Sequence, residues 1–288
     1  MERQSSGQTT FFAYFLACLR KCIFMVLSSG PLPRHIAFIM DGNRRFCKKN
    51  NLMEGAGHRV GFSALMSMLK YCYEFRVKYV TIYAFSIDNF RRRPEEVQSV
   101  MDLMQEKIEG LTKEESIVNQ YGVKVRFVGN LQMLNKPVRL AAERAMVATA
   151  NNSKAVLTIC VAYTSTDEIL HAVRESCEEK RYELNALEAT GSGPYGLLGP
   201  NNNEKEQEEL FIDLSEIEKH MYVTPDPDII VRTSGETRLS NFLLWQSSVS
   251  LLYSPLVLWP EIQFWHLVWA VIEFQRNYLY LKGKVKQQ

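Results

Sequence analysis

The sequence contains no arrangement of residues that is typical of a zinc site. Its six cysteines form no Cys-x-x-Cys pair, and its five histidines form no His-Glu-x-x-His motif. These absences argue against zinc fingers and zinc peptidases, because both bind the metal through closely spaced cysteine or histidine ligands. Unpaired thiols in a reducing compartment are the simplest interpretation of the cysteines.

A large excess of one charge is also absent. The chain of 288 residues carries 34 Lys and Arg and 32 Asp and Glu, a formal net charge of +2. A protein that binds mainly nucleic acid needs a broad positive field, so we expect no nucleic-acid partner and only local anion sites. With 46% hydrophobic and 23% charged residues, the chain can bury a full globular core.

Long hydrophobic runs are missing as well, since none reaches the roughly 18 residues that a membrane-spanning helix requires. Residues 11–27 come nearest, but Arg20 and Lys21 interrupt them in the middle, where a spanning helix or a signal peptide tolerates charge least. We therefore expect residues 1–30 to form an apolar or amphipathic helix that associates with a membrane surface or a partner. An ordinary helix that covers the protein's own core is the alternative.

What the sequence does contain is a regular alternation of strand-like and helix-like segments. Short apolar runs rich in β-branched and aromatic residues predict strands at 35–40, 79–85, 123–128, 155–162 and 228–232. Apolar residues spaced three and four apart predict helices at 58–75, 94–111, 137–150, 166–178, 214–220 and 264–281, with less regular apolar elements at 242–258. Strands separated by helices indicate an α/β fold, with a mainly parallel central sheet flanked by helices.

Residues 179–209 interrupt this alternation. They are rich in Gly, Pro, Asn and Glu and show no hydrophobic period, which predicts a flexible surface loop to which the sequence assigns no role. The sequence therefore predicts one domain over residues 31–281 that contains this insert, followed by a short basic tail at 282–288.

Polar loops follow three of the predicted strands, at 40–45, 85–93 and 232–240. Because the carboxyl ends of parallel strands meet at one edge of a sheet, these loops would come together there. They would then form a pocket for more than one diphosphate, lined by Arg45, Arg92, Arg232, Arg238 and Ser240. Asp41 suits Mg²⁺, which is typically held by one or two carboxylates together with substrate phosphates. Each loop alone reads as an ordinary surface turn, but polar loops at three strand ends favour a site.

Five motifs, in order along the chain, closely resemble the cis-prenyltransferase family. They are HIAFIMDGNRR at 35–45, GHRVGF at 57–62, YAFSIDNFRRRPEEV at 83–97, PDPDIIVRTSGETRLSNFLLWQ at 225–246 and LWPE at 258–261. Within the family the chain is most similar to eukaryotic dehydrodolichyl diphosphate synthases, and more narrowly to plant enzymes of the dolichol and rubber types. The resemblance implies repeated condensation of isopentenyl diphosphate onto an allylic diphosphate such as farnesyl diphosphate, with each new double bond cis.

The resemblance also implies roles for individual residues. Asp41 is expected to bind Mg²⁺ and the departing diphosphate, and Asn89 to help relay the proton that the reaction releases. The substrate-binding residues that it implies are Gly42, Asn43, Arg44 and Arg45 in the allylic diphosphate loop, His58 beside that loop, Ser86 near the reacting centre, and Arg232, Arg238 and Ser240 for isopentenyl diphosphate. The family fold includes an apolar tunnel, whose candidate walls here are residues 58–75 and 94–111; plain core helices are the alternative.

The chain departs from the family pattern at its end. Active members usually finish with an Arg-x-Gly signature, whereas this chain finishes KGKVKQQ at 282–288. We therefore expect the catalytic subunit of a heteromer, in which a partner of the Nogo-B receptor type supplies that tail and a membrane anchor. The expected location is the cytosolic face of the endoplasmic reticulum membrane.

Other functions fit the sequence less well. A haloacid-dehalogenase-like phosphatase needs a second aspartate where Asn43 stands, and trans-type prenyltransferases need aspartate-rich helices, although this chain has no Asp-Asp pair. A non-catalytic scaffold or regulatory subunit of a prenyltransferase complex is the main alternative. Product length is left open, so dolichol and rubber precursors are both compatible with the sequence.

Overall fold

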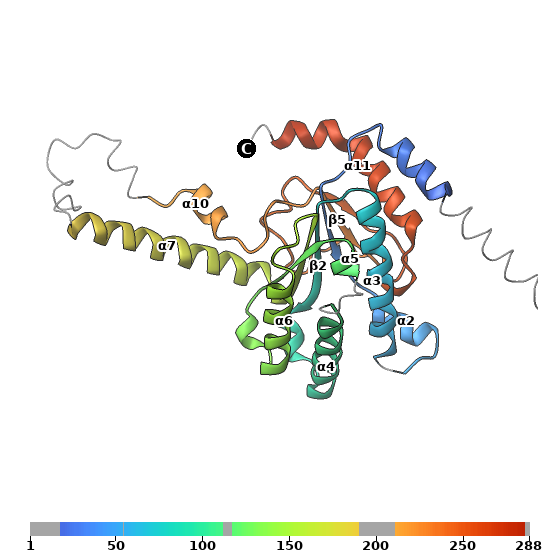
Figure 1. The fold of residues 1–288 in the computed structure, drawn as a ribbon, viewed down its shortest axis with the longest axis horizontal. Helices are drawn as coiled ribbons and strands as arrows, with labels where there is room; N and C mark the ends of the chain where they lie inside the picture. The colour runs from blue at the N-terminus through green and yellow to red at the C-terminus, as the bar shows by residue number, and fades with distance from the viewer. Residues whose placement is uncertain (1–17, 54, 112–116, 190–210, 286–288) are drawn as a thin grey trace, which may run out of the picture.

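A parallel sheet forms the centre of the protein. The computed structural model describes residues 18–53, 55–111, 117–189 and 211–285. Six strands follow the order β3-β4-β2-β1-β5-β6, and every neighbouring pair is parallel. Helices surround the sheet (Figure 1). They are β1 (His35–Ile39), β2 (Tyr79–Ser86), β3 (Val123–Val128), β4 (Ala155–Tyr163), β5 (Ile229–Arg232) and β6 (Leu251–Tyr253). The first five confirm the predicted strands, whereas β6 emerges from the apolar stretch at 242–258.

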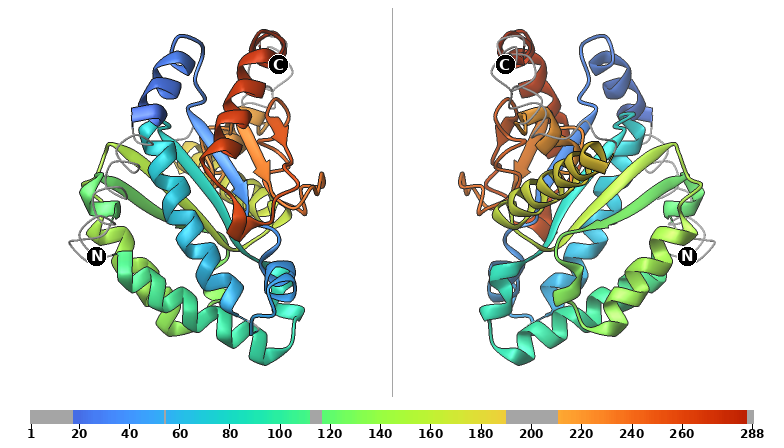
Figure 2. Two further views of the ribbon diagram at one scale, coloured as in Figure 1. Left: turned by 90° about the vertical axis from the view of Figure 1, so that its right-hand side faces the viewer. Right: turned by 90° about the vertical axis from the view of Figure 1, so that its left-hand side faces the viewer.

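Helices cover both faces of this sheet, which confirms the α/β fold (Figure 2). One face carries α3 (Ala56–Glu74), α4 (Pro94–Leu111), α6 (Lys136–Ala148) and α11 (Phe264–Val285). The opposite face carries α7 (Ser165–Ala189) and α10 (Leu214–Lys219). The shorter elements are α2 (Asn43–Lys49), α5 (Ile117–Gln120) and the 3-10 helices η1 (Ile87–Arg91), η2 (Leu131–Met133) and η3 (Trp259–Glu261).

Burial explains why these segments take these conformations. All five residues of β1 are buried, because β1 lies between β2 and β5 with side chains packed on both faces, as is usual for parallel strands. In α3 the buried Leu65, Met68 and Cys72 recur at helical spacing and face the sheet. The sheet is therefore rigid up to its carboxyl edge, where the chain leaves β1, β2 and β5.

The prediction of a flexible loop at 179–209 is wrong for the first part of that segment. Helix α7 continues to Ala189, so residues 179–189 are helical. Charged residues tie this extension to its surroundings: Lys180 pairs with Glu183 and Glu216, and His220 contacts Glu179 at 2.8 Å. Glu, Lys and Arg are good helix formers, and the extension contacts α10 through charge, so it carries no apolar period in the sequence. Residues 190–209 lie outside the described residues.

The N-terminal segment packs on the protein itself over the part that the structure describes. Residues 18–27 are helical, and Ile23, Phe24 and Leu27 contact the main core. The guanidinium of Arg20 lies 5.9 Å from the centre of the Tyr71 ring. The alternative that this helix covers the core is thus confirmed for one of its faces, while residues 1–17 lie outside the described part. No helix among the described residues has the length and apolarity needed to cross a membrane.

The predicted basic tail at 282–288 is also partly helical. Helix α11 runs to Val285, so the expected basic tail begins as the last turn of a helix. Lys282 and Lys284 lie in that turn, where the helix dipole favours positive charge. Residues 286–288 lie outside the described part of the chain.

Candidate active site

Three strands bring the predicted loops together. Strands β2, β1 and β5 are neighbours in the sheet and point the same way. Asp41 follows β1 after one intervening residue, Ser86 ends β2, and Arg232 ends β5. The expectation that these residues meet at one edge of the sheet is therefore confirmed, and each is held at the end of a rigid element.

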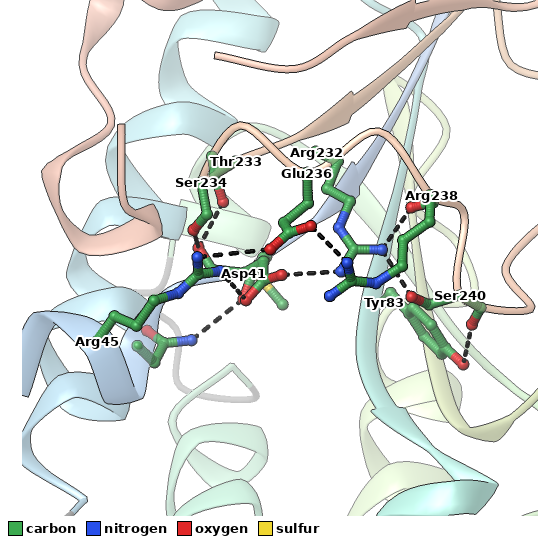
Figure 3. Close-up of polar contacts among 11 residues, drawn as sticks. Asp41, Arg45, Tyr83, Arg232, Thr233, Ser234, Glu236, Arg238 and Ser240 are labelled. Atoms are coloured by element: carbon green, nitrogen blue, oxygen red, sulfur yellow. Dashed lines mark hydrogen bonds and ion pairs between the residues drawn. The ribbon is translucent and has the colours of Figure 1, made fainter. Parts of the chain in front are cut away.

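Asp41 is the centre of the contacts at this edge (Figure 3). Its Oδ2 accepts a hydrogen bond from Arg232 Nη2 at 2.8 Å, and its Oδ1 accepts one from Arg45 Nη2 at 3.1 Å. Partial burial alone would raise the pKa of this carboxyl, but the hydrogen bonds and positive charges of the two arginines outweigh burial and lower the pKa below its usual value. Asp41 is therefore ionised at neutral pH.

The backbone around Asp41 is also fixed from several directions. Its carbonyl oxygen accepts hydrogen bonds from Thr233 Oγ1 at 2.6 Å, Ser234 Oγ at 2.9 Å and the amide of Trp259 at 2.9 Å. Gly42 follows with φ +112, and a Cβ there would lie 2.6 Å from Ser234 Oγ. Only glycine combines this left-handed conformation with such close packing. The turn that presents Asp41 is therefore preorganised.

Arg232 links the first and third loops. It is buried, and besides Asp41 it donates from Nη1 to Ser240 Oγ at 2.6 Å and to the carbonyl of Arg238. Its Nε is buried and has no partner. Tyr83 supports Ser240 from below by donating to the Ser240 carbonyl at 3.4 Å. Arg232 also lines the cavity described below, where its positive charge attracts an anion.

Glu236 is a residue of this site that the sequence analysis did not select. Its Oε1 lies 3.6 Å from Arg45 Nη1, and its Oε2 pairs with Arg238 Nη1 (Figure 3). The TSGETR motif contains this acid, but no spacing rule connects it to Arg45, which lies far away in the sequence. We call the set Asp41, Arg45, Arg232, Glu236, Arg238 and Ser240 the Asp41 cluster.

A second polar group faces the same region. Arg92 donates to Glu96 Oε1 at 2.9 Å and to Asn89 Oδ1 at 3.0 Å, and Arg44 lies 3.8 Å from Glu96. His58 lies beside them; burial first, and then the positive charge of Arg92, lower its pKa, so the neutral imidazole is favoured. We call the set Arg44, His58, Asn89, Arg92 and Glu96 the Glu96 cluster. Glu96, like Glu236, was not among the predicted site residues.

Two more predicted residues shape the loops. Ser86 caps η1 by accepting from the amide of Asp88 at 3.2 Å. Asn43 donates to the Met40 carbonyl at 3.2 Å, while its Oδ1 is buried without a partner. The hydrogen bond to Met40 holds the Asn43 side chain within the turn that follows β1.

All twelve predicted site residues line one cavity of about 1350 Å³, which also contains a long apolar part. These twelve residues are Asp41, Gly42, Asn43, Arg44, Arg45, His58, Ser86, Asn89, Arg92, Arg232, Arg238 and Ser240. The apolar part runs between α3 and α4 over the sheet and is lined by Phe62, Leu65, Met66, Leu103, Met104 and Ile108, among others. The predicted tunnel walls are thus confirmed as walls of a cavity. The chemical roles assigned to the twelve residues stay predictions.

Lys107 of α4 is a charged residue that lines the cavity beside its apolar part. Its Nζ lies 5.3 Å from the centre of the Phe62 ring, across from α4 to α3, and 2.7 Å from Glu106 Oε1. Lys107 is thus a charged residue in the lining of a largely apolar region, and its ammonium is paired with the Glu106 carboxylate.

The donor set is compatible with Mg²⁺ but not with a metal cage. Among the described residues no group of three or more His, Cys, Asp or Glu side chains could hold a metal ion. Asp41 and Glu236 are two carboxylates that share Arg45 as a neighbour. One or two carboxylates together with substrate phosphates and water are the usual ligands of Mg²⁺ in phosphate-binding sites, so the residues fit that ion.

Comparisons with known proteins agree with this geometry. The family model described as putative undecaprenyl diphosphate synthase matches residues 39–279. Dehydrodolichyl diphosphate synthase CPT3 from Solanum lycopersicum is 65% identical over 271 residues, covering 93% of each chain. The Homo sapiens dehydrodolichyl diphosphate synthase complex subunit DHDDS is 41% identical and covers 89% of this chain and 71% of its own.

A solved structure supports the fold. The crystal structure of lavandulyl diphosphate synthase from Lavandula x intermedia, in complex with dimethylallyl diphosphate, superimposes with a TM-score of 0.68 at 24% identity. It covers 85% of this chain and 95% of the other.

Proposed function

This chain belongs to the cis-prenyltransferase family, and we propose that it extends an allylic diphosphate, such as farnesyl diphosphate, by repeated condensation with isopentenyl diphosphate. The product is a long-chain cis-polyprenyl diphosphate. The observation that carries the proposal is the single cavity whose one end is lined by arginines and whose other end is apolar. Such a cavity can hold two diphosphates and a hydrocarbon tail at the same time.

The Asp41 cluster supplies the electrostatics for the departure of diphosphate. Arg45, Arg232 and Arg238 are donors held in place before the substrates bind, so they stabilise the charge that develops without reorganising. Asp41, with Glu236 nearby, would hold Mg²⁺, which when bound neutralises diphosphate oxygens and favours their departure. Arg232, which lines the cavity, and the exposed side chain of Arg238 serve isopentenyl diphosphate in this proposal.

The Glu96 cluster lies on the side of the cavity where the new bond would form. Asn89 accepts from Arg92, so the orientation of its amide is fixed. In the proposal this amide helps to carry away the proton that the condensation releases. His58 beside Arg92 favours its neutral form, so it adds no charge at this point of the cavity.

The apolar part receives the growing tail. Its wall residues come from α3, α4 and the sheet, and none of Leu65, Met66, Leu103 and Met104 carries a charge. Typical pockets for drug-sized ligands measure roughly 300–1,000 Å³, so a cavity of about 1350 Å³ holds a moderate prenyl chain but no very long one. A long product would therefore extend beyond the cavity. The relatives' names include both dehydrodolichyl diphosphate synthases and a rubber cis-polyprenyltransferase, so the proposal covers both classes of product.

We further propose that the chain acts in a heteromer at a membrane. The human relative is named as a subunit of a complex, which supports a partner, here one of the Nogo-B receptor type. Leu244, Leu252 and Leu256 are exposed beside edge strand β6 and offer an apolar surface for it. A lipid product favours the surface of a membrane, and we place it at the cytosolic face of the endoplasmic reticulum.

The test is an elongation assay with labelled isopentenyl diphosphate, farnesyl diphosphate and Mg²⁺, using the chain alone and together with such a partner. We expect chain growth by successive isoprene units, much faster with the partner. If the chain alone elongates as fast as the chain with its partner, the partner is not needed and that part of the proposal is wrong. Absence of elongation under both conditions would favour the non-catalytic scaffold.

A further inference from the structure

The N-terminal helix has an outer face that the protein's own core does not cover. The exposed residues of this helix are Cys18, Leu19, Lys21, Cys22, Met25 and Val26. Met25 and Val26 are each 70% exposed, although both are apolar. Positions three and four apart fall on one side of a helix, so the two thiols lie next to each other on this outer face, with Met25 and Val26 about one turn beyond Cys22.

The body of the protein fixes the direction of this stripe. Phe24 packs edge-on against Phe75, with ring centres 5.4 Å apart, and the guanidinium of Arg76 covers the Phe24 ring at 5.9 Å. Gln275 of α11 donates to the Leu27 carbonyl at 2.7 Å and closes the end of the helix. Figure 1 shows the helix, in blue, lying beside α11 on the outside of the molecule. The thiols therefore point outward from a docked helix.

We propose that Cys18 and Cys22 are sites of S-acylation by long-chain fatty acids. Each thiol would lose its proton, and its sulfur would attack the carbonyl carbon of a long-chain acyl-coenzyme A thioester. The bond between that carbon and the coenzyme A sulfur breaks, and coenzyme A leaves as a thiol with a proton. A cysteine on an amphipathic helix is the usual substrate of membrane acyltransferases, which catalyse this exchange.

The spacing of four residues between Cys18 and Cys22 allows two acyl chains to be attached side by side on one face of the helix. One buried acyl chain gives only marginal and reversible membrane binding, whereas two signals give stable anchoring. Cys18 and Cys22 would insert two neighbouring chains on the same side, Met25 and Val26 would enter the lipid with them, and Lys21 would meet the headgroups. The modification itself does not depend on the proposed function, which only gives the anchoring a purpose, namely release of a lipid product.

The remaining cysteines provide the contrast. Cys47, Cys72 and Cys160 are buried and cannot meet an acyltransferase. Cys177 is exposed on α7, but its neighbours in the sequence are Glu175, Glu178 and Glu179, which a membrane surface disfavours. Cys177 is thus a matched control for exposure without the apolar stripe.

The test uses the full chain, expressed together with its partner in eukaryotic cells. Free thiols are blocked with N-ethylmaleimide, thioesters are cleaved with hydroxylamine, and the released thiols are tagged with a maleimide polymer that shifts the mass. We expect two tags on the wild type, one on C18S or C22S, none on the double variant and two on C177S, all dependent on hydroxylamine. A wild type without tags, or a tag that disappears in C177S, would overturn the proposal.

Enzyme activity separates this proposal from the previous one. Cys18 and Cys22 do not line the cavity, so the double variant should keep the elongation rate of the wild type in detergent. Its membrane binding is compared with that of the wild type in cells that express the chain without the partner, where no other anchor acts, and we expect it to be lost. Tags without elongation would contradict the proposed function alone. Elongation without tags would contradict the acylation alone.

Discussion

The polar and apolar ends of the cavity are built in different ways. The polar end consists of loops after β1, β2 and β5, held by directed bonds such as Arg232 to Asp41 at 2.8 Å. The apolar end is lined by side chains of α3 and α4 such as Leu65, Met66 and Met104, which have no hydrogen-bonding groups comparable with those of the polar end. Directed bonds are sensitive to position, whereas apolar walls are sensitive to volume. We therefore expect changes at the polar end to alter rate and changes at the apolar end to alter product length.

The largest effect is expected for Asp41→Asn. This change keeps the size of the side chain and its ability to accept hydrogen bonds, but it removes the charge that holds Mg²⁺ and orients two arginines. Loss of one preorganised electrostatic group costs about 10²–10³ in rate, which initial-rate assays with labelled isopentenyl diphosphate would measure. Thermal unfolding serves as the control. A rate within about twofold of the wild type would remove Asp41 from the mechanism.

Arg238→Ala tests the assignment of the two diphosphates. Arg238 is 65% exposed and pairs with Glu236, so its loss should leave the fold intact. A hydrogen bond to a charged group contributes about 1.5–3 kcal/mol, so the KM for isopentenyl diphosphate should rise about tenfold or more. Steady-state kinetics with each substrate varied in turn give both KM values. An effect on the allylic substrate alone would mean that the two subsites are reversed.

Met104→Trp sharpens the comparison from the apolar side. The larger side chain would reduce the volume between α3 and α4, so the products should become shorter while the rate of the first condensation stays near that of the wild type. Chromatography of the dephosphorylated lipids measures the length. Val147→Trp, on the exposed face of α6, is the control for adding a tryptophan. An unchanged length distribution would show that this part of the cavity does not hold the tail.

The smallest effect is expected for His58→Gln, measured as stability against pH. Burial and Arg92 lower the pKa of His58 from 6.5, so the unfolded chain takes up a proton at a higher pH than the folded chain. His58 therefore destabilises the folded protein progressively as the pH falls below about 6.5, and has no such effect above it. When the pH is lowered from about 7 to about 5.5, the melting temperature of the variant should fall less than that of the wild type. His266→Gln, outside the cavity, is the control, and identical curves for His58→Gln and wild type would contradict this account.

The sequence predicted the parts of the site that lie directly after its apolar strand segments. The apolar runs that form β1, β2 and β5 fix where Asp41, Ser86 and Arg232 emerge, and the order of the elements implies that they meet. Glu236 could not be found in this way, because its place in the site depends on its ion pair with Arg45, which lies far away in the sequence. Hydrophobic periodicity reports burial and not the pairing of surface charges.

The same reasoning explains the errors in the fold. Strand β6 has only three residues, and Leu252 at its centre is half exposed, so the apolar stretch at 242–258 did not reveal where a strand begins or ends. The continuation of α7 to Ala189 rests on helix-forming charged residues and a contact with α10, which leave no apolar period. The N-terminal helix is apolar on both faces, so its sequence could not tell which face meets the core.

The most direct test of the central claim is a structure of the protein with Mg²⁺ and farnesyl thiodiphosphate, an analogue that resists loss of its diphosphate. We predict that Mg²⁺ contacts Asp41, that the diphosphate lies within hydrogen-bonding distance of Arg45, and that the prenyl tail runs between α3 and α4. A ligand bound outside this cavity, or inside it with its tail toward the Asp41 cluster, would contradict the account.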